Sequence, residues 1–151
     1  PPPPPPPLPT ATVRRSVEAT WSFRHDAAAC LAAAQHPALT LSITVGKDGQ
    51  VAIALRPGPA LQPAGRRNTV VPVAFAGETV AWRERGRLGP SGAVILSQPL
   101  DEVAASRVLQ LLAGGTVEVG GIRPGWPLLQ LPAAGAAGRD WFECVRRRLF
   151  S

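Results

Sequence analysis

The chain contains no tyrosine and no methionine, and among its 151 residues there are only two cysteines and two histidines. Aromatic residues make up 5% and charged residues 17% of the sequence. Histidine, cysteine and tyrosine provide many acid–base catalysts and many metal ligands, so their scarcity excludes the usual zinc-binding spacings and most catalytic sets. We therefore expect no catalytic residues, no metal site and no cofactor.

The motifs that bind phosphate or activate a nucleophile are missing as well. The sequence has no Walker-type loop, no GxGxxG motif after a strand and no Gly-x-Ser-x-Gly elbow. The pairs Gly114–Gly115 and Gly120–Gly121 flank a short apolar segment and predict turns. Asp101 and Glu102 lie at the start of a predicted helix, where interaction with the helix dipole explains them. The sequence predicts that the protein is not an enzyme.

Long apolar runs are also missing, since no stretch approaches the ~20 residues needed to cross a bilayer. Proline, in contrast, is abundant: the chain has 18 prolines, and eight of them lie among the first nine residues. Such a run favours an extended polyproline helix, which serves as a spacer or as a docking peptide for an aromatic groove. We expect residues 1–13 to form a proline-rich tail or linker and residues 14–151 to form a single domain.

Basic residues outnumber acidic ones, 16 to 10, which gives a net charge of +6, and every basic residue except Lys47 is an arginine. One explanation of this excess is a compositional bias toward arginine that has no functional role. The other is a functional one, contact with an anionic partner. Charge alone leaves both interpretations open. Two groups of arginines are candidate partner-binding residues, one that would project from one side of the strand at 80–82 if that strand extends to Arg87, and one at the end of a predicted helix: Arg83, Arg85, Arg87, Arg146, Arg147 and Arg148.

Hydrophobic periodicity predicts both strands and helices. Apolar and polar side chains alternate in the expected strands, with turns at residues 46–49 and around Gly77 joining two hairpins: 16–23, 39–45, 51–55, 71–75, 80–82, 93–96, 117–119 and 129–131. Helices are expected at three places: 27–35, 99–113 and 141–149. Because consecutive strands with short connections pair antiparallel, the predicted class is α+β, with an antiparallel sheet of about five to seven strands and two or three helices packed on it.

The two cysteines, Cys30 and Cys144, fall on the first and the last predicted helices. Asp26 precedes the first of these helices as its expected N-cap residue. In a reducing cytosol the two thiols would be small core side chains. In an oxidising compartment they would form a disulfide, worth up to about 4 to 5 kcal/mol by loop-closure arguments. We favour the disulfide, because the even count, the paired placement and a start without methionine are typical of an exported, processed chain.

Trp126 lies between Pro124–Gly125 and Pro127, in a predicted turn. An exposed tryptophan at this place would be a partner-binding residue. A tryptophan that packs over the sheet edge would instead belong to the core. The sequence leaves both roles open.

The stretch WPLLQLPAAGAAGRDWFECV, residues 126–145, combines an apolar strand, a glycine-containing turn and a helix with an aromatic residue and a cysteine. The segments WSFRHDAAACLAAA and VVPVAFAG agree with the same pattern. Together they resemble the invasion-associated locus B-like periplasmic proteins of α-proteobacteria, over residues 16 to 149. The resemblance implies a periplasmic, disulfide-supported, non-enzymatic domain, and it transfers no ligand and no catalytic residue.

These features favour a non-enzymatic periplasmic or envelope accessory domain, with a structural or protein-binding role in a membrane-associated complex. Such a protein would be periplasmic or secreted, with a membrane tether ahead of residue 1 as a further option. Its expected partner is a protein rather than a small-molecule substrate. The alternative is an arginine-rich protein that associates with nucleic acid.

Overall fold

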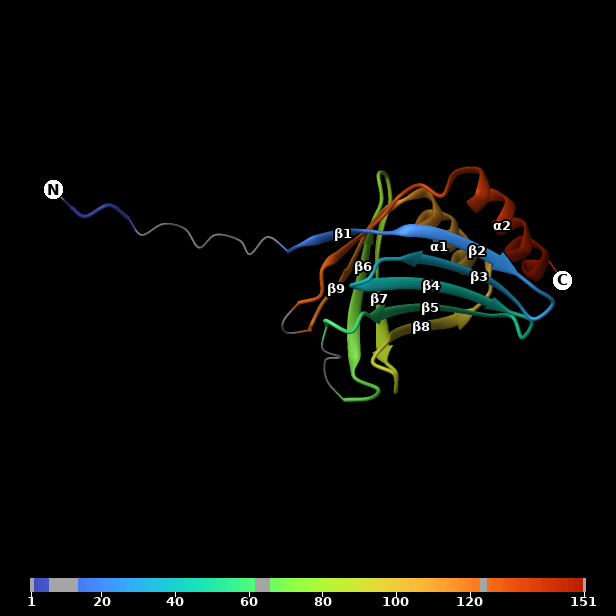
Figure 1. The fold of residues 1–151 in the computed structure, drawn as a ribbon, viewed down its shortest axis with the longest axis horizontal. Helices are drawn as coiled ribbons and strands as arrows, with labels where there is room; N and C mark the ends of the chain where they lie inside the picture. The colour runs from blue at the N-terminus through green and yellow to red at the C-terminus, as the bar shows by residue number, and fades with distance from the viewer. Residues whose placement is uncertain (1, 6–13, 62–65, 123–124, 151) are drawn as a thin grey trace.

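Figure 1 shows the fold of the computed structural model, which describes residues 2–5, 14–61, 66–122 and 125–150. Within these residues the chain forms ten strands and two helices, in the order β1 (Ser16–Glu18), β2 (Thr20–His25), β3 (Ala29–Gln35), β4 (Leu39–Gly46), β5 (Gln50–Pro57), β6 (Val70–Ala76), β7 (Ala81–Leu88), β8 (Val94–Pro99), α1 (Glu102–Ala113), β9 (Gly115–Val119), β10 (Leu128–Leu131) and α2 (Gly135–Leu149). The predicted proline-rich tail falls mostly outside the described residues, and the described residues 2–5 are exposed and form neither helix nor strand.

All ten strands belong to one sheet, in the order β1-β10-β9-β6-β7-β8-β5-β4-β3-β2. The two edge strands of this order, β1 and β2, are consecutive in the chain and are separated only by Ala19. The sheet therefore curls until its edges meet, and β6 and β7 run across the direction of β3, β4, β5 and β8 (Figure 1). The result is a mixed, nearly closed, barrel-like sheet.

The predicted fold class is wrong. The described sheet has ten strands instead of five to seven, it has two helices beside it, and it is not purely antiparallel. The parallel pair is β1 with β10, in the register Val17↔Leu129. Hydrophobic alternation predicts that the residues around Val17 form a strand. It does not show which strands they pair with, so it could not reveal that the pairing partner changes from β10 to β3 at Ala19.

The predicted helix at residues 27–35 is also wrong, because these residues form strand β3. Alanine favours helices locally, but here Cys30, Ala32 and Ala34 alternate inward and are buried under the helices. Asp26 does accept backbone N–H groups through Oδ1, from Ala28 at 2.7 Å and Ala29 at 2.9 Å. It stabilises the turn of the β2–β3 hairpin rather than the start of a helix.

The two predicted hairpins and the helix before Gly114 are present, and the last helix begins at Gly135, six residues before the predicted 141. The β4–β5 hairpin pairs Val45 with Val51 across the Gly46–Gly49 turn, and the β6–β7 hairpin pairs Ala76 with Ala81. Helix α1 begins after Asp101, whose side chain accepts from the backbone N–H of Ala104, and ends at Gly114. These segments carry strong local signals: alternation, turn residues and caps.

The core lies between the concave side of the sheet and the two helices. Helix α1 buries Ala104, Ala105, Val108, Leu111 and Leu112, and α2 buries Trp141, Phe142 and Val145. Helix α2 packs against α1, β2 and β3. Among the described residues none of the buried ones is charged or polar, so apolar burial holds the two layers together. Neither described helix combines the length and apolar character of a membrane span.

Candidate functional site: disulfide, basic face and seam

The predicted disulfide is present. Cys30 Sγ on β3 and Cys144 Sγ on α2 lie 2.02 Å apart, and their Cα atoms are 6.0 Å apart. Cys30 is completely buried, so the bond joins the last helix to the concave side of the sheet. Such a bond fits an oxidising environment outside the cytoplasm.

Several hydrogen bonds surround this disulfide and attach α2 to the β2–β3 hairpin. The indole N–H of Trp141 donates to the carbonyl oxygen of Arg24 at 3.2 Å. Arg148 Nη2 donates to the carbonyl oxygens of Asp26 and Ala27, each at 3.4 Å. Arg148 was a candidate partner-binding residue, and its contacts here are structural.

Asp26 has a pKa below its ordinary value of 3.8. The main causes are the hydrogen bonds that its carboxylate accepts from the backbone of Ala28 and Ala29. Desolvation opposes this shift, and the positive charges of Arg24 and Arg148 make smaller contributions that lower the pKa further. Asp26 is therefore a turn-stabilising carboxylate.

Trp126 is 1% exposed and is one of the largest fully buried side chains of the described chain. This burial excludes the role as an exposed partner-binding residue and agrees with the alternative that Trp126 belongs to the core. Although it follows Gly125 in an irregular segment just before β10, its ring belongs to the same apolar cluster as Leu129 on that strand. Burial of so large an apolar surface outweighs the local turn signal of the neighbouring glycine and prolines.

The two groups of arginines do not form one cluster. Arg83, Arg85 and Arg87 point outward from β7, whereas Arg146 and its two neighbours lie at the end of α2. Helix α2 packs beside β2, which is five strand positions from β7, or about 24 Å along the sheet. Arg146 also pairs with Glu143 at 3.2 Å on the same helix.

The structure instead adds two further arginines to the β7 group. Strands β7, β8, β5, β4, β3 and β2 are consecutive in the sheet, and we call the outward-facing side of these six strands the basic face. Its cations are Arg24, Arg56, Arg83, Arg85 and Arg87. Among the described strand residues of this face no outward position holds Asp or Glu. Arg24 and Arg56 were not predicted, because only the pairing of the strands brings them to this surface.

Most other positions of the basic face are small or polar. The strand register places Ser97, Ala52, Thr44, Leu31 and Arg24 in one row across the five strands from β8 to β2. A parallel row contains Arg87, Ile95, Ala54, Ser42, Ala33 and Ser22. Small and polar side chains therefore separate Arg24 on β2 from the arginines of β7, and Arg56 lies between them on β5.

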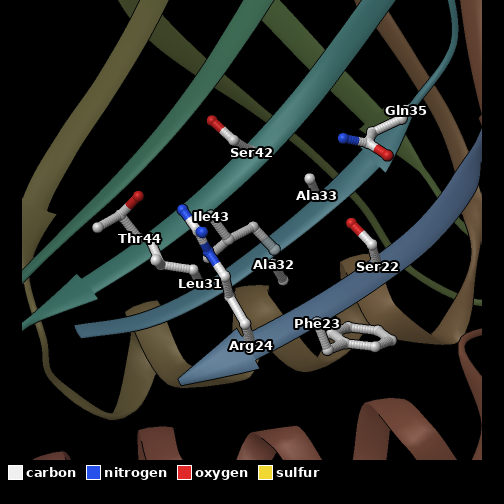
Figure 2. A pocket seen from close by; sticks show the side chains of 10 residues that line it. All are labelled: Ser22, Phe23, Arg24, Leu31, Ala32, Ala33, Gln35, Ser42, Ile43 and Thr44. Atoms are coloured by element: carbon white, nitrogen blue, oxygen red, sulfur yellow. The ribbon is translucent and has the colours of Figure 1, made fainter. Parts of the chain in front are cut away.

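A shallow depression of about 420 Å³ lies on this face over β2, β3 and β4. In Figure 2, Arg24 extends from β2 above the sheet toward Leu31 and Thr44, while Ser22, Ser42 and Gln35 line the same hollow. These groups offer one cation and several hydrogen-bonding atoms. No Asp, Glu, His or Cys is among the residues that line this hollow.

Opposite the disulfide, the sheet opens. Strands β7 and β8 pair only at Arg87↔Ile95 and Leu88↔Val94, and beyond these residues they diverge. We call the gap between residues 81–86 of β7 and residues 96–99 of β8 the seam. A groove of about 380 Å³ lies beside it, between α1 and the start of β7.

Polar contacts connect α1 to β7 at the seam. The Glu84 carboxylate pairs with the guanidinium of Arg107 on α1. The same guanidinium lies 5.1 Å from the ring centroid of Trp82, and Trp82 in turn packs against Phe75 with ring centroids 5.4 Å apart. Local sequence patterns gave no sign of the seam, since it arises where one pair of strands stops.

In the part of the chain that the structure describes, no group of three or more His, Cys, Asp or Glu side chains is arranged to hold a metal ion. Comparison with protein-family models, curated proteins and solved structures gives no match for this chain. The resemblance to the invasion-associated locus B-like proteins stays a prediction.

Proposed function

We propose that this chain is a non-enzymatic, protein-binding accessory domain of a periplasmic or secreted assembly, and that its basic face binds an acidic protein surface. The observation that carries the proposal is the charge distribution of six adjacent strands, which have five outward arginines and no outward carboxylate. Such a one-signed surface attracts a partner of opposite charge and repels basic ones.

The side chains between the arginines support a protein partner. Ala33, Ala52, Ala54 and Ser42 are small side chains with little side-chain entropy to lose when they are covered. Arginine pairs well with carboxylates through two parallel hydrogen bonds. No outward strand position of the basic face is aromatic, whereas proteins that bind single-stranded nucleic acid stack bases on aromatic rings.

The disulfide supports a location outside the cytoplasm, because such bonds persist in oxidising compartments. Thiol titration of protein purified without reductant from its native cells checks this part of the proposal. We expect no free thiol before reduction and two after it. Two reactive thiols in the native protein would place it in the cytosol instead.

The binding proposal is tested with two double variants that remove the same charge. R83Q/R85Q changes the basic face, and R146Q/R147Q changes the exposed end of α2. Fluorescence anisotropy with labelled polyglutamate at low salt should show a loss of about tenfold or more for the first variant. The second variant should bind within about threefold of the unchanged protein.

Duplex and single-stranded DNA of matched charge serve as competitors in the same assay. Weaker binding to DNA than to polyglutamate supports the protein partner. Tighter binding to DNA, lost on R83Q/R85Q and falling steeply with salt, would overturn it in favour of nucleic acid.

A further inference from the structure

The backbone of β7 has unused hydrogen-bonding groups at the seam. Leu88 exchanges backbone hydrogen bonds with Thr69 and Asn68, on the β6 side, and the Val80 carbonyl accepts from Gly77, also on that side. The register between β6 and β7 is continuous from Ala76↔Ala81 to Val70↔Arg87. Since successive residues of a strand direct their backbone groups to opposite sides, the even-numbered residues of β7 bond to β6 and the odd-numbered ones face β8.

Of these odd-numbered residues, Arg87 pairs with Ile95 of β8. No described strand pairs with Ala81, Arg83 and Arg85 on that side. Their N–H and C=O groups form a free strand edge, which is the kind of edge that accepts another extended chain.

The groove beside this free edge has an apolar part and a polar part. Val80, Ala81 and Trp82 of the β6–β7 hairpin and Val103 of α1 form the apolar part, and α1 also contributes four polar residues: Glu102, Ser106, Arg107 and Gln110. Val103 and Val80 are 59% and 41% exposed, which is unusual for side chains that lie next to each other around a hollow. Trp82 Nε1 is buried and has no hydrogen-bond partner among the described residues.

The outer side of the same edge is basic. Arg83 and Arg85 are exposed and belong to the basic face, on the same residues whose backbone groups are free. A strand added antiparallel would place its outward side chains directly opposite these arginines and its inward side chains over the groove. An added strand would therefore need different residues on its inward and outward sides.

We propose that the β7 edge binds an extended segment of the partner protein as an additional strand, with acidic residues at the positions opposite Arg83 and Arg85 and apolar residues between them. This inference rests on the proposed function and specifies its mode: main-chain hydrogen bonds to Ala81, Arg83 and Arg85 give affinity, and the alternating side chains give specificity. The added strand extends the β7–β8 pairing along the part of β7 that β8 leaves free.

The first experiment uses a seven-residue peptide of alternating glutamate and valine. A hydrogen-exchange measurement by NMR, on the intact disulfide-bonded protein, follows the backbone amides of β7. The peptide should slow the exchange of Ala81, Arg83 and Arg85 amides by tenfold or more, and should leave Trp82 and Glu84, already bonded to β6, nearly unchanged. Protection confined to other strands, or absence of peptide binding, would overturn strand addition.

Two methylated forms of the peptide provide the matched control, because they differ only in which amides can donate. In an antiparallel added strand, the glutamates opposite Arg83 and Arg85 direct their N–H groups to β7 and the valines direct theirs away. N-methylation of the glutamates should lower affinity by about tenfold or more, while N-methylation of the valines should change it by less than about threefold. Equal affinity of both forms would overturn the inference.

A charge exchange separates this inference from the proposed function. The variant R83E/R85E should bind the glutamate–valine peptide about tenfold more weakly and should bind a lysine–valine peptide more tightly than the unchanged protein does. The variant R146E/R147E should keep the original preference for the glutamate–valine peptide. If polyglutamate binds the basic face but the methylation pattern has no effect, the inference fails and the proposed function stands. If neither polyglutamate nor the peptide responds to R83E/R85E, both fail.

Discussion

The barrel-like sheet is held in different ways on its two opposite sides. Near β2, β3 and α2, a disulfide, a buried tryptophan and several side-chain hydrogen bonds join elements from both ends of the chain. At the seam, β7 and β8 share two residue pairs, and α1 contacts β7 through one ion pair and one cation–π contact. The first side has covalent and buried connections, and the second has partly exposed, polar ones.

This difference indicates a division of roles. A small domain with marginal stability benefits from concentrating its strongest constraints in one region. A region that binds an extended segment must keep unpaired backbone groups accessible, and this lowers its own local stability. The disulfide side therefore stabilises the fold while the seam stays available for contact.

The largest effect is expected from removing the disulfide. The variant C30A/C144A should lose about 4 kcal/mol of unfolding free energy, because the bond closes a loop with a sequence separation of 114 residues. Urea denaturation measures the loss, and the unchanged protein in reductant should behave like the variant. Reductant should have no further effect on C30A/C144A. A loss below about 1 kcal/mol would mean that the hydrogen bonds and packing of α2 hold this side without the covalent bond.

A smaller loss is expected from G86A, at the corner where β7 meets β8. A Cβ at Gly86 would lie 2.6 Å from Val94 Cγ1, and Val94 is fully buried, so the strands must separate. We expect a loss of about 1 to 3 kcal/mol in thermal or urea unfolding. S97A, on the exposed side of β8, is the control and should change stability by less than about 0.5 kcal/mol. An equal effect of both variants would contradict close packing at the corner.

R107A should have a modest effect that is confined to the seam. It removes the partner of Glu84 and the cation above Trp82, two partly exposed contacts that together are worth about 1 kcal/mol. Hydrogen exchange should become faster in β7 and α1 but not in β3. R139A, an exposed arginine on α2, controls for the change in net charge. Faster exchange near Cys30 as well would show that the two sides are coupled.

The smallest effect concerns pH. The pKa of Asp26 is lowered in the folded protein, so its carboxylate stabilises the β2–β3 turn at pH values above the ordinary 3.8 and loses this effect as the pH falls below it. Melting temperatures between pH 2.5 and 6 should fall less on acidification in D26N, whose side chain still offers an oxygen to Ala28 and Ala29. Identical pH profiles of D26N and the unchanged protein would show that the Asp26 carboxylate does not stabilise this turn.

The sequence predicted those parts of the fold that depend on local signals. The hairpins around Gly46–Gly49 and Gly77, the caps of α1 at Asp101 and Gly114, and the last helix follow from alternation, turn residues and spacing. The segment 27–35 failed because the helix preference of alanine is weak against its position between β2 and β4. The disulfide was found in spite of this error, since a pairing of two cysteines does not depend on the element that carries them.

The candidate site was only partly predictable. Alternation correctly predicted that Arg83, Arg85 and Arg87 share one side of their strand. Arg24 and Arg56 joined them only through strand order, and the free edge of β7 depends on where pairing with β8 stops. The role of Trp126 stayed open in the sequence, because the turn residues beside it say nothing about the apolar cluster that covers its ring.

The change of pairing partner at Ala19 affects how the protein folds, because it makes closure of the barrel depend on a long-range strand pairing. Strands β2 to β5 form successive hairpins between neighbouring segments, but β1 pairs with β10, so Val17 and Leu129 come together from distant parts of the chain. Closure of the barrel therefore depends on β10, the last of the described strands. A folding intermediate without β10 in place leaves β1 unpaired, and unpaired strand edges of this kind favour aggregation.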